Sequence, residues 1–250
     1  WQFSLYNVHR FFPWFYLFKG LPAHPFQFGR GLLNYRRLVR HSGGGYLSGT
    51  ASLDQLATLA KKKNRFLIAP GFCMKPYDYA QGRSTCPAGH FNHKCQVLSD
   101  ISLLNNPARR PKPCSQCGIA PLAQRASEIG ADVYIMTSAI DIARDVYIPA
   151  LQNKGARVGL FFLCPYSLEP FTFGLATSGL RGFLVPFCQG ACSTHQEWTN
   201  ADIGIKNNQT FVASEEWQDV LELLEKLVAI RGDVKNQPFV FKNHVYRTIF

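Results

Sequence analysis

Eight cysteines are the residues of this 250-residue chain with the most specific chemistry. Six of them lie among polar residues, prolines and glycines, where a thiol that serves only as a small buried hydrophobe is not expected. These six are Cys86, Cys95, Cys114, Cys117, Cys188 and Cys192, while Cys73 and Cys164 come close after apolar segments. Thiolates are the ligands of iron–sulfur clusters and of structural zinc sites. We therefore expect all eight to be metal ligands.

Ligand number favours iron–sulfur clusters over zinc. One structural zinc takes four thiolates, whereas this set could hold one or two 4Fe–4S clusters. Cys86 and Cys164 are each followed by proline, as is a ligand in bacterial ferredoxin sequences, although the cysteine spacing differs from theirs. Zinc remains the alternative, because Cys114 and Cys117 form a Cys-x-x-Cys pair that a second pair, with Cys95 and Cys86, would complete.

Three histidines lie close to the cysteines in the sequence. His90 and His93 fall inside the segment 86–95, and His195 comes soon after Cys192. A histidine in place of a thiolate would raise the potential of a cluster or complete a zinc site. The alternative is that these rings lie outside the ligand set or at the surface, and both interpretations stay open.

Helices and strands must bring the cysteines together, and their pattern is regular from residue 52 onward. Ser52 followed by Gln55 is a capping-box signature for a helix. The alternation that follows indicates βαβ units, hence an α/β fold with an open, mostly parallel, Rossmann-like sheet flanked by helices. A long cysteine-rich loop over 72–117 interrupts it. We expect helices at 52–63, 121–129, 138–153, 168–178 and 215–230, and strands at 65–71, 131–136, 156–162 and 182–187.

The carboxyl edge of this sheet is the predicted position of the metal centre. Cys73, Cys164 and Cys188 each follow a different predicted strand. Loops at the carboxyl ends of parallel strands meet at one edge, so cysteines far apart in the sequence would become neighbours there. Cys114 and Cys117 precede the helix at 121–129, and their loop should reach the same edge.

A helix predicted to begin after Ser138 would start at this edge too. Its N-terminal amides would then favour thiolates or an anionic ligand. The alternative is an ordinary helix cap, with Asp141, Arg144 and Asp145 on a solvated face.

The first 50 residues differ from the rest in composition. We expect 1–50 to be an aromatic, basic N-terminal extension, joined through the flexible glycines 43–45 to a cysteine-rich α/β metal-binding domain over 51–250. Residues 1–65 hold ten Lys or Arg against one acid, within a formal net charge of +11. Such a segment suits an anionic membrane surface, so residues 1–45 are predicted to dock on a membrane or a membrane complex. Packing on the body or on another subunit is the alternative.

No apolar run in the sequence reaches the ~18 residues that a bilayer-spanning helix requires. We therefore expect a cytoplasmic protein that lies at the inner face of the membrane.

Several segments together resemble a known family. The segments 69–73 (APGFC), 114–118 (CSQCG), 133–138 (VYIMTS) and 163–165 (LCP) follow the order found in the bacterial and archaeal "domain of unknown function 116" family, and the resemblance covers roughly 65–210. It implies a cysteine-rich, metal-binding α/β domain without a settled activity. It also implies a preferred ligand set of Cys73, Cys114, Cys117 and Cys164. The second set is then Cys86, Cys95, Cys188 and Cys192.

The leading functional hypothesis is an iron–sulfur cluster-binding protein that exchanges electrons with a redox partner protein, as a peripheral membrane or complex-associated subunit. A metal-dependent enzyme is the second, because a centre with three thiolates keeps a coordination position open for substrate. A zinc-stabilised nucleic-acid-binding module is the third, although the basic residues form no recognisable reading motif and nucleic acid is the least expected partner. No Ser-His-Asp order, Walker loop or dinucleotide-binding glycine motif supports another chemistry.

Overall fold

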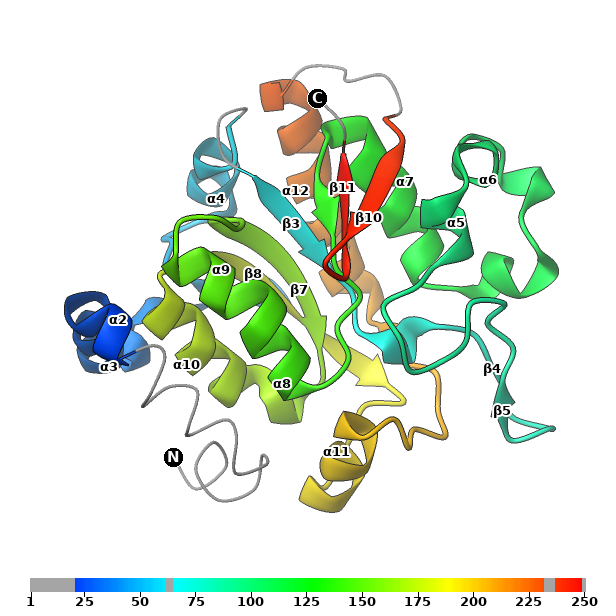
Figure 1. Ribbon diagram of the computed structural model, residues 1–250, viewed down its shortest axis with the longest axis horizontal. Coiled ribbons are helices and arrows are strands. Elements are labelled where there is room, and N and C mark those ends of the chain that lie inside the picture. Colours follow the sequence, from blue (N-terminus) through cyan, green and yellow to red (C-terminus); the bar gives the residue numbers. More distant parts are fainter. Residues whose placement is uncertain (1–20, 62–64, 232–236, 249–250) are drawn as a thin grey trace.

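One nine-stranded sheet with helices on both faces organises the computed structural model, which describes residues 21–61, 65–231 and 237–248 (Figure 1). The predicted aromatic segment 1–20 lies outside these residues. The path through the sheet is β1-β2-β8-β7-β3-β6-β11-β10, and β9 pairs with the end of β8. The strands are β1 (Val39–Ser42), β2 (Gly45–Ser48), β3 (Phe66–Ala69), β6 (Asp132–Val133), β7 (Val158–Leu163), β8 (Arg181–Gln189), β9 (Phe211–Val212), β10 (Phe239–Lys242) and β11 (Val245–Thr248).

The centre of the sheet is parallel, as predicted. Strands β8, β7, β3 and β6 run in the same direction, and every residue of β3 and β7 is buried. Strands covered on both faces need apolar residues at every position, which explains the continuous apolar sequences. Antiparallel strands then extend the sheet at both sides, through β2 next to β8 and β11 next to β6.

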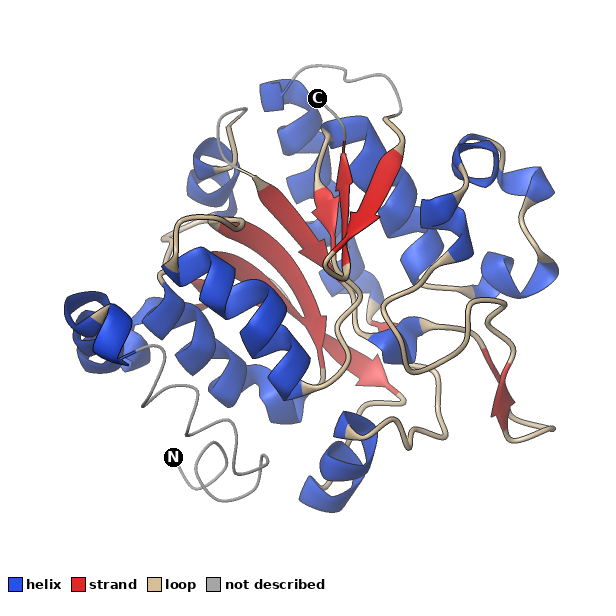
Figure 2. Ribbon diagram, in the orientation of Figure 1, coloured by secondary structure: helices blue, strands red, loops and turns tan. Residues whose placement is uncertain are grey.

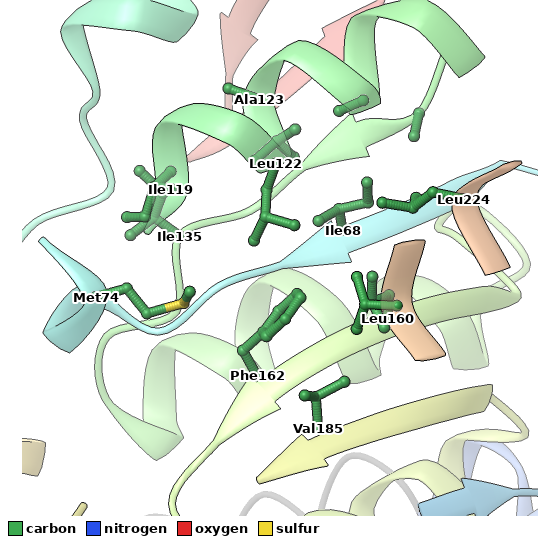
Figure 3. Close-up of a cluster of buried hydrophobic side chains, with 14 of the residues drawn as sticks. Ile68, Met74, Ile119, Leu122, Ala123, Ile135, Leu160, Phe162, Val185 and Leu224 are labelled. Atoms are coloured by element: carbon green, nitrogen blue, oxygen red, sulfur yellow. The ribbon is translucent and has the colours of Figure 1, made fainter. Parts of the chain in front are cut away.

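Alternate residues of each central strand belong to two different cores, as strand geometry requires. Ile68, Leu160, Phe162 and Val185 point to one face, where Figure 3 shows them packed towards Leu122 and other side chains of the covering helices. The helices on that face are α4 (Leu53–Leu59), α7 (Ile119–Ile129) and α12 (Ser214–Arg231). The opposite face is covered by α3 (Pro25–Leu38), α8 (Ala139–Ile142), α9 (Ile148–Leu151) and α10 (Leu168–Ser178). Figure 2 shows the last three in front of the sheet.

The helix predicted at 138–153 contains a π-helical segment. α8 continues into π-helical residues Ala143–Tyr147 and then into α9. The Ile148 amide bonds to the Ala143 carbonyl oxygen, five residues earlier, and Pro149 has no amide hydrogen with which to restore the usual ladder.

The N-terminal part of the chain is built into the body. β2 pairs with β8, and α3 packs on α10, where Gln27 Nε2 donates to the Ser178 carbonyl oxygen at 2.7 Å. The glycines 43–45, predicted to be a flexible joint, instead form the tight turn between β1 and β2. Gly43 has a φ of +57°, a conformation that glycine adopts without strain. The described part of the predicted extension therefore shares the sheet and a helix layer with the rest.

The cysteine-rich segment 72–117 contains only short elements. These are the 3-10 turns η3 (Phe72–Met74), η4 (Pro107–Arg109) and η5 (Lys112–Gln116), the hairpin of β4 (Tyr77–Asp78) and β5 (Arg83–Ser84), and helices α5 (Gln96–Ser99) and α6 (Ile101–Asn105). Within the described ranges, no helix combines the length and the apolar character that crossing a membrane requires.

Candidate functional site

Three cysteines meet at the carboxyl edge of the parallel strands. Cys73 follows β3, Cys164 follows β7, and Cys192 lies just beyond the end of β8. All three are buried and line one cavity of about 110 Å³. We call these residues the edge thiol group and the space beside them the edge cavity. Cys73 and Cys164 thus lie together at this edge, as expected from the strand order.

Apolar side chains form most of the wall of the edge cavity. Phe72, Phe162, Phe171 and Met136 contribute to it, together with Trp198 from the unpredicted helix α11 (His195–Asp202). The wall also includes the charged residues Lys206 and Asp202, so a molecule that enters the cavity meets the thiols on a mostly apolar surface.

Cys164 and Cys192 are hydrogen-bonded to one another. The Cys192 amide donates to Cys164 Sγ at 3.4 Å, and each of the two thiols shifts the pKa of the other. Lys206 Nζ donates to Cys192 Sγ at 3.3 Å and to the Gly190 carbonyl oxygen at 2.5 Å. Lys206 is only 9% exposed, and no carboxylate among the described residues forms an ion pair with it. Its positive charge therefore acts at short range on the Cys192 sulfur.

The edge thiol group holds its protons unequally. The hydrogen bond with Cys164, aided by the charge of Lys206, outweighs burial and lowers the pKa of Cys192 to about 6. The same hydrogen bond, together with burial, raises the pKa of Cys164. Burial raises the pKa of Cys73 to about 11. At neutral pH the group consequently contains one thiolate, at Cys192, and two neutral thiols.

Four other cysteines form a second group, which lies beside another buried lysine, Lys75. Cys86 acts electrostatically on Cys95, Cys114 and Cys117, and three of these thiols, those of Cys86, Cys95 and Cys117, act on Lys75. We call these four cysteines the loop thiol group, because they come from the segment 72–117.

Lys75 has neutral hydrogen-bond partners only. The residue is 1% exposed, and its Nζ donates to the Gly89 carbonyl oxygen at 2.9 Å, the Asn92 carbonyl oxygen at 2.9 Å and Asn92 Oδ1 at 3.0 Å. No carboxylate in the described part of the chain pairs with it. Burial lowers the pKa of Lys75, and nearby thiolates oppose that shift. A buried ammonium of this kind lacks a counter-ion unless the surrounding thiols ionise.

Burial keeps the thiols of Cys95, Cys114 and Cys117 protonated when no metal is bound. It raises the pKa of Cys117 to about 12 and that of Cys95 to about 11, and it also raises the pKa of Cys114. Backbone amides at the start of α7 and of α5 bond to the Cys117 and Cys95 sulfurs respectively and partly oppose these shifts. Metal coordination would remove the protons outright.

Side chains far away in the sequence hold this segment on the body. Tyr246 Oη accepts a hydrogen bond from the Cys95 amide at 2.8 Å. Gln209 Nε2 donates to the carbonyl oxygens of Gln116 at 2.6 Å and Met74 at 3.3 Å. The loop thiol group is therefore fixed from two sides.

In neither thiol group do the sulfurs lie close enough together to bind one metal ion as they stand. In residues 21–61, 65–231 and 237–248, no three cysteine sulfurs lie within 4.8 Å of one another. A tetrahedral zinc with Zn–S bonds of about 2.3 Å needs sulfurs about 3.8 Å apart. One zinc would therefore require the cysteine side chains to move, whereas a four-iron cluster binds each thiolate through a different iron.

The structure pairs the cysteines differently from the two sets that the family resemblance implied. Cys73 and Cys164 lie with Cys192, whereas Cys114 and Cys117 lie with the loop cysteines. Cys188 belongs to neither group: it is exposed on β8 next to buried Phe187, because neighbouring residues of a strand point to opposite faces.

The three histidines are held by groups other than the thiols. His93 Nδ1 contacts the Ile135 carbonyl oxygen at 2.8 Å, and the His195 ring lies tilted against Trp198. The His90 ring packs edge-on against Phe72, and burial, aided by the charges of two lysines (Lys75 and Lys206), lowers its pKa to about 4. His90 thus lies within electrostatic reach of Lys75 and Lys206, the two lysines beside the thiol groups.

A histidine–carboxylate cluster was not recognised from the sequence. Ligand atoms of His93, Asp145 and His244 lie within 4.8 Å of one another. Arg144 Nη2 already donates to Asp145 Oδ2 at 2.9 Å, to Asp141 Oδ1 at 2.7 Å and contacts His244 Nδ1 at 3.0 Å. The Arg144 guanidinium therefore supplies the positive charge that a metal ion would otherwise bring to this cluster. The solvated helix face expected for Asp141, Arg144 and Asp145 is wrong for Asp145, whose side chain is 7% exposed, whereas the Arg144 side chain is 50% exposed. The sequence signal was weak because His244 comes from the unpredicted β10–β11 turn.

Compared with protein-family models, curated proteins and solved structures, the chain matches none. The resemblance to the "domain of unknown function 116" family therefore stays a prediction.

Proposed function

We propose that this chain binds an iron–sulfur cluster through Cys86, Cys95, Cys114 and Cys117 and exchanges electrons with a redox partner protein. The observation that carries the proposal is a buried lysine, Lys75, among these thiols with no carboxylate partner in the described residues.

Charge balance supports a metal centre at this position. A 4Fe–4S core in its oxidised state with four thiolates carries two net negative charges, and the Lys75 ammonium offsets one of them. Neutral thiols would leave the ammonium unpaired in a buried place, at a cost of several kcal/mol. Since burial raises the pKa of the Cys95 and Cys117 thiols, metal binding is the means by which they would ionise near neutral pH.

Two further features favour a cluster over zinc. No three cysteine sulfurs of the described residues lie within 4.8 Å of one another, which favours a cluster with separate irons over one tetrahedral ion. Amides at the start of α5 and α7 bond to the Cys95 and Cys117 sulfurs, and such bonds stabilise thiolate ligands and adjust the potential of a cluster.

A membrane surface or a membrane complex is the proposed place of action. Phe26 and Leu33 of α3 are 90% and 84% exposed, and Arg30 and Arg37 follow the same helical spacing. An apolar and cationic helix face of this kind suits the interface of an anionic bilayer.

Anaerobic purification with iron, zinc and acid-labile sulfide counted per chain tests the proposal. We expect about four irons and four sulfides, and a visible absorption band that dithionite bleaches. Cys117→Ser should lose most of the iron, whereas Cys188→Ser, which changes an exposed cysteine outside both groups, should keep it. A colourless protein with no iron and no sulfide would refute the proposal, and one zinc per chain, lost in Cys117→Ser, would replace it with the zinc alternative.

A further inference from the structure

We propose that Cys164 and Cys192 form a redox-active dithiol that reduces small apolar disulfides bound in the edge cavity. This site is separate from the proposed cluster and uses none of its ligands.

The geometry of the pair suits disulfide formation. Cys164 lies directly after β7 and Cys192 just after β8, two adjacent strands with continuous parallel pairing. The Cys192 amide donates a hydrogen bond to Cys164 Sγ at 3.4 Å, and both cysteines line the edge cavity. Two thiols held next to each other need little chain movement to form a disulfide bond. A distant pair would need the backbone to move.

Lys206 distinguishes the roles of the two sulfurs. Its Nζ donates to Cys192 Sγ at 3.3 Å, and the Gly190 carbonyl oxygen fixes the ammonium in place. A cation beside one sulfur favours the thiolate, which is the nucleophile in disulfide exchange. Cys192 is therefore the attacking residue and Cys164 the residue that resolves the intermediate.

The edge cavity identifies the class of substrate. Its wall combines Phe162, Phe171, Met136 and Trp198 with the three edge thiols, so it offers an apolar surface of small volume. A neutral disulfide with an aromatic or aliphatic body fits this surface, whereas a disulfide that carries several carboxylates would lose its hydration and meet a single cation, Lys206, which already contacts Cys192.

The reaction balances without another reagent. The Cys192 thiolate attacks one sulfur of the substrate R–S–S–R, breaks its S–S bond and releases one thiolate RS⁻. Cys164 then loses its proton to solvent, attacks the Cys192 sulfur and expels the second RS⁻. Two electrons pass from the dithiol to the substrate, and a Cys164–Cys192 disulfide remains. A small dithiol reverses the same steps.

A single-turnover experiment with 4,4′-dithiodipyridine, a neutral aromatic disulfide, tests the proposal. In a Cys188→Ser background we expect fast release of two thiopyridone molecules and a disulfide-linked pair of peptides that contain Cys164 and Cys192. Adding Cys164→Ser should trap a mixed disulfide on Cys192. Adding Cys192→Ser should slow the fast phase about tenfold or more. Glutathione disulfide, which is charged, should react more slowly with all forms.

Two results would overturn the proposal. One is a fast phase that survives Cys192→Ser while thermal unfolding shows the variant to be folded. The other is loss of iron in Cys164→Ser or Cys192→Ser, which would make these cysteines cluster ligands. Absence of iron from the protein altogether would refute the proposed cluster but would leave the dithiol reaction intact, so the two failures are distinguishable.

Discussion

The ammonium nitrogen of Lys206 lies 3.3 Å from the sulfur of Cys192, a residue 14 positions earlier in the chain. The segment between them contains α11, which turns the chain back so that a lysine reaches the end of β8. The two side chains thus form a buried pair of opposite charges once the thiol ionises.

Replacing either neighbour of Cys192 should raise the pKa of its thiol above about 6. Cys164→Ala and Lys206→Gln should each raise it, because Cys164 and Lys206 both lower the pKa of Cys192. Iodoacetamide alkylation of Cys192 followed against pH gives both values, and Lys206→Gln should slow the reaction at pH 7 about threefold to tenfold. Lys226→Gln, at a partly exposed lysine elsewhere, is the control. A pKa of Cys192 in Lys206→Gln equal to that of the wild type would contradict this prediction.

Removing the charge of Lys75 should lower the reduction potential of the proposed cluster. The reduced cluster carries one more negative charge than the oxidised one, so a nearby cation stabilises the reduced state more. Lys75→Met keeps most of the side-chain length and loses the charge, whereas Lys94→Gln changes an exposed lysine of the same loop. A redox titration followed by visible absorption gives both potentials, and a potential in Lys75→Met equal to or above that of the wild type would contradict the assigned role.

Two glycines of α3 should respond to alanine in opposite directions. A Cβ at Gly31 would lie 2.4 Å from the Ala176 carbonyl oxygen of α10, whereas a Cβ at Gly29 would meet nothing within 4 Å. Gly31→Ala should lower the free energy of unfolding by about 2 kcal/mol through overpacking. Gly29→Ala should raise it by up to about 1 kcal/mol, since alanine favours helix. Urea unfolding of both variants decides whether α3 packs on the body in solution, and equal effects would argue that it does not.

Asp145→Asn should destabilise the protein at neutral pH. Burial alone would raise the pKa of Asp145, but hydrogen bonds from Arg144 and His244 outweigh it and hold that pKa below the ordinary 3.8. A lowered pKa gives stability that is fully present above the ordinary value and is lost as the pH falls through the lowered one. The variant should therefore lose about 2 kcal/mol at pH 7, and its difference from the wild type should shrink below about pH 4.

Asp54→Asn supplies the comparison for this network, because Asp54 pairs with Lys226 while its own side chain is 76% exposed. An exposed pair contributes less than about 1 kcal/mol, so this variant should change the free energy of unfolding little at any pH. Equal losses in both variants would remove the special role of the buried network.

The exposed apolar residues of α3 should matter for membrane binding. A double variant, Phe26→Ser with Leu33→Ser, should bind anionic phosphatidylserine vesicles at least about tenfold more weakly, because each side chain would bury apolar surface in the interface. Ile203 and Ile205 are 52% and 54% exposed elsewhere, and changing both to serine should have little effect. Unchanged vesicle binding by the α3 variant would refute docking through this face.

The central layers could be predicted because their sequences carry strong patterns. The helix expected at 168–178 is α10, Leu168–Ser178, and the strand expected at 156–162 is β7, Val158–Leu163. Long apolar segments alternating with helical periodicity leave few other arrangements. The two hairpins at the sheet edges escaped prediction, since β1 and β10 are short, mostly exposed and lack alternation.

The position of the site followed from topology, but its composition did not. The carboxyl ends of parallel strands bring Cys73 and Cys164 together, as expected. Lys75 and Lys206 stand alone in the sequence, and their relation to the thiols depends on backbone carbonyls and on turns that no local pattern specifies. Cys188 belongs to neither group because it faces outward from β8, and the register of the strand determines that orientation.

The hydrogen bond from the Cys95 amide to Tyr246 spans 151 residues of sequence. A nascent chain that has just completed its cysteine-rich segment still lacks the tyrosine that fixes it, and it also lacks Gln209. During synthesis on the ribosome, all four loop cysteines are therefore present in the chain long before the residues that fix their positions have been made. Any metal delivered to them in their final arrangement must arrive after the β10–β11 hairpin has left the ribosome and paired with β6.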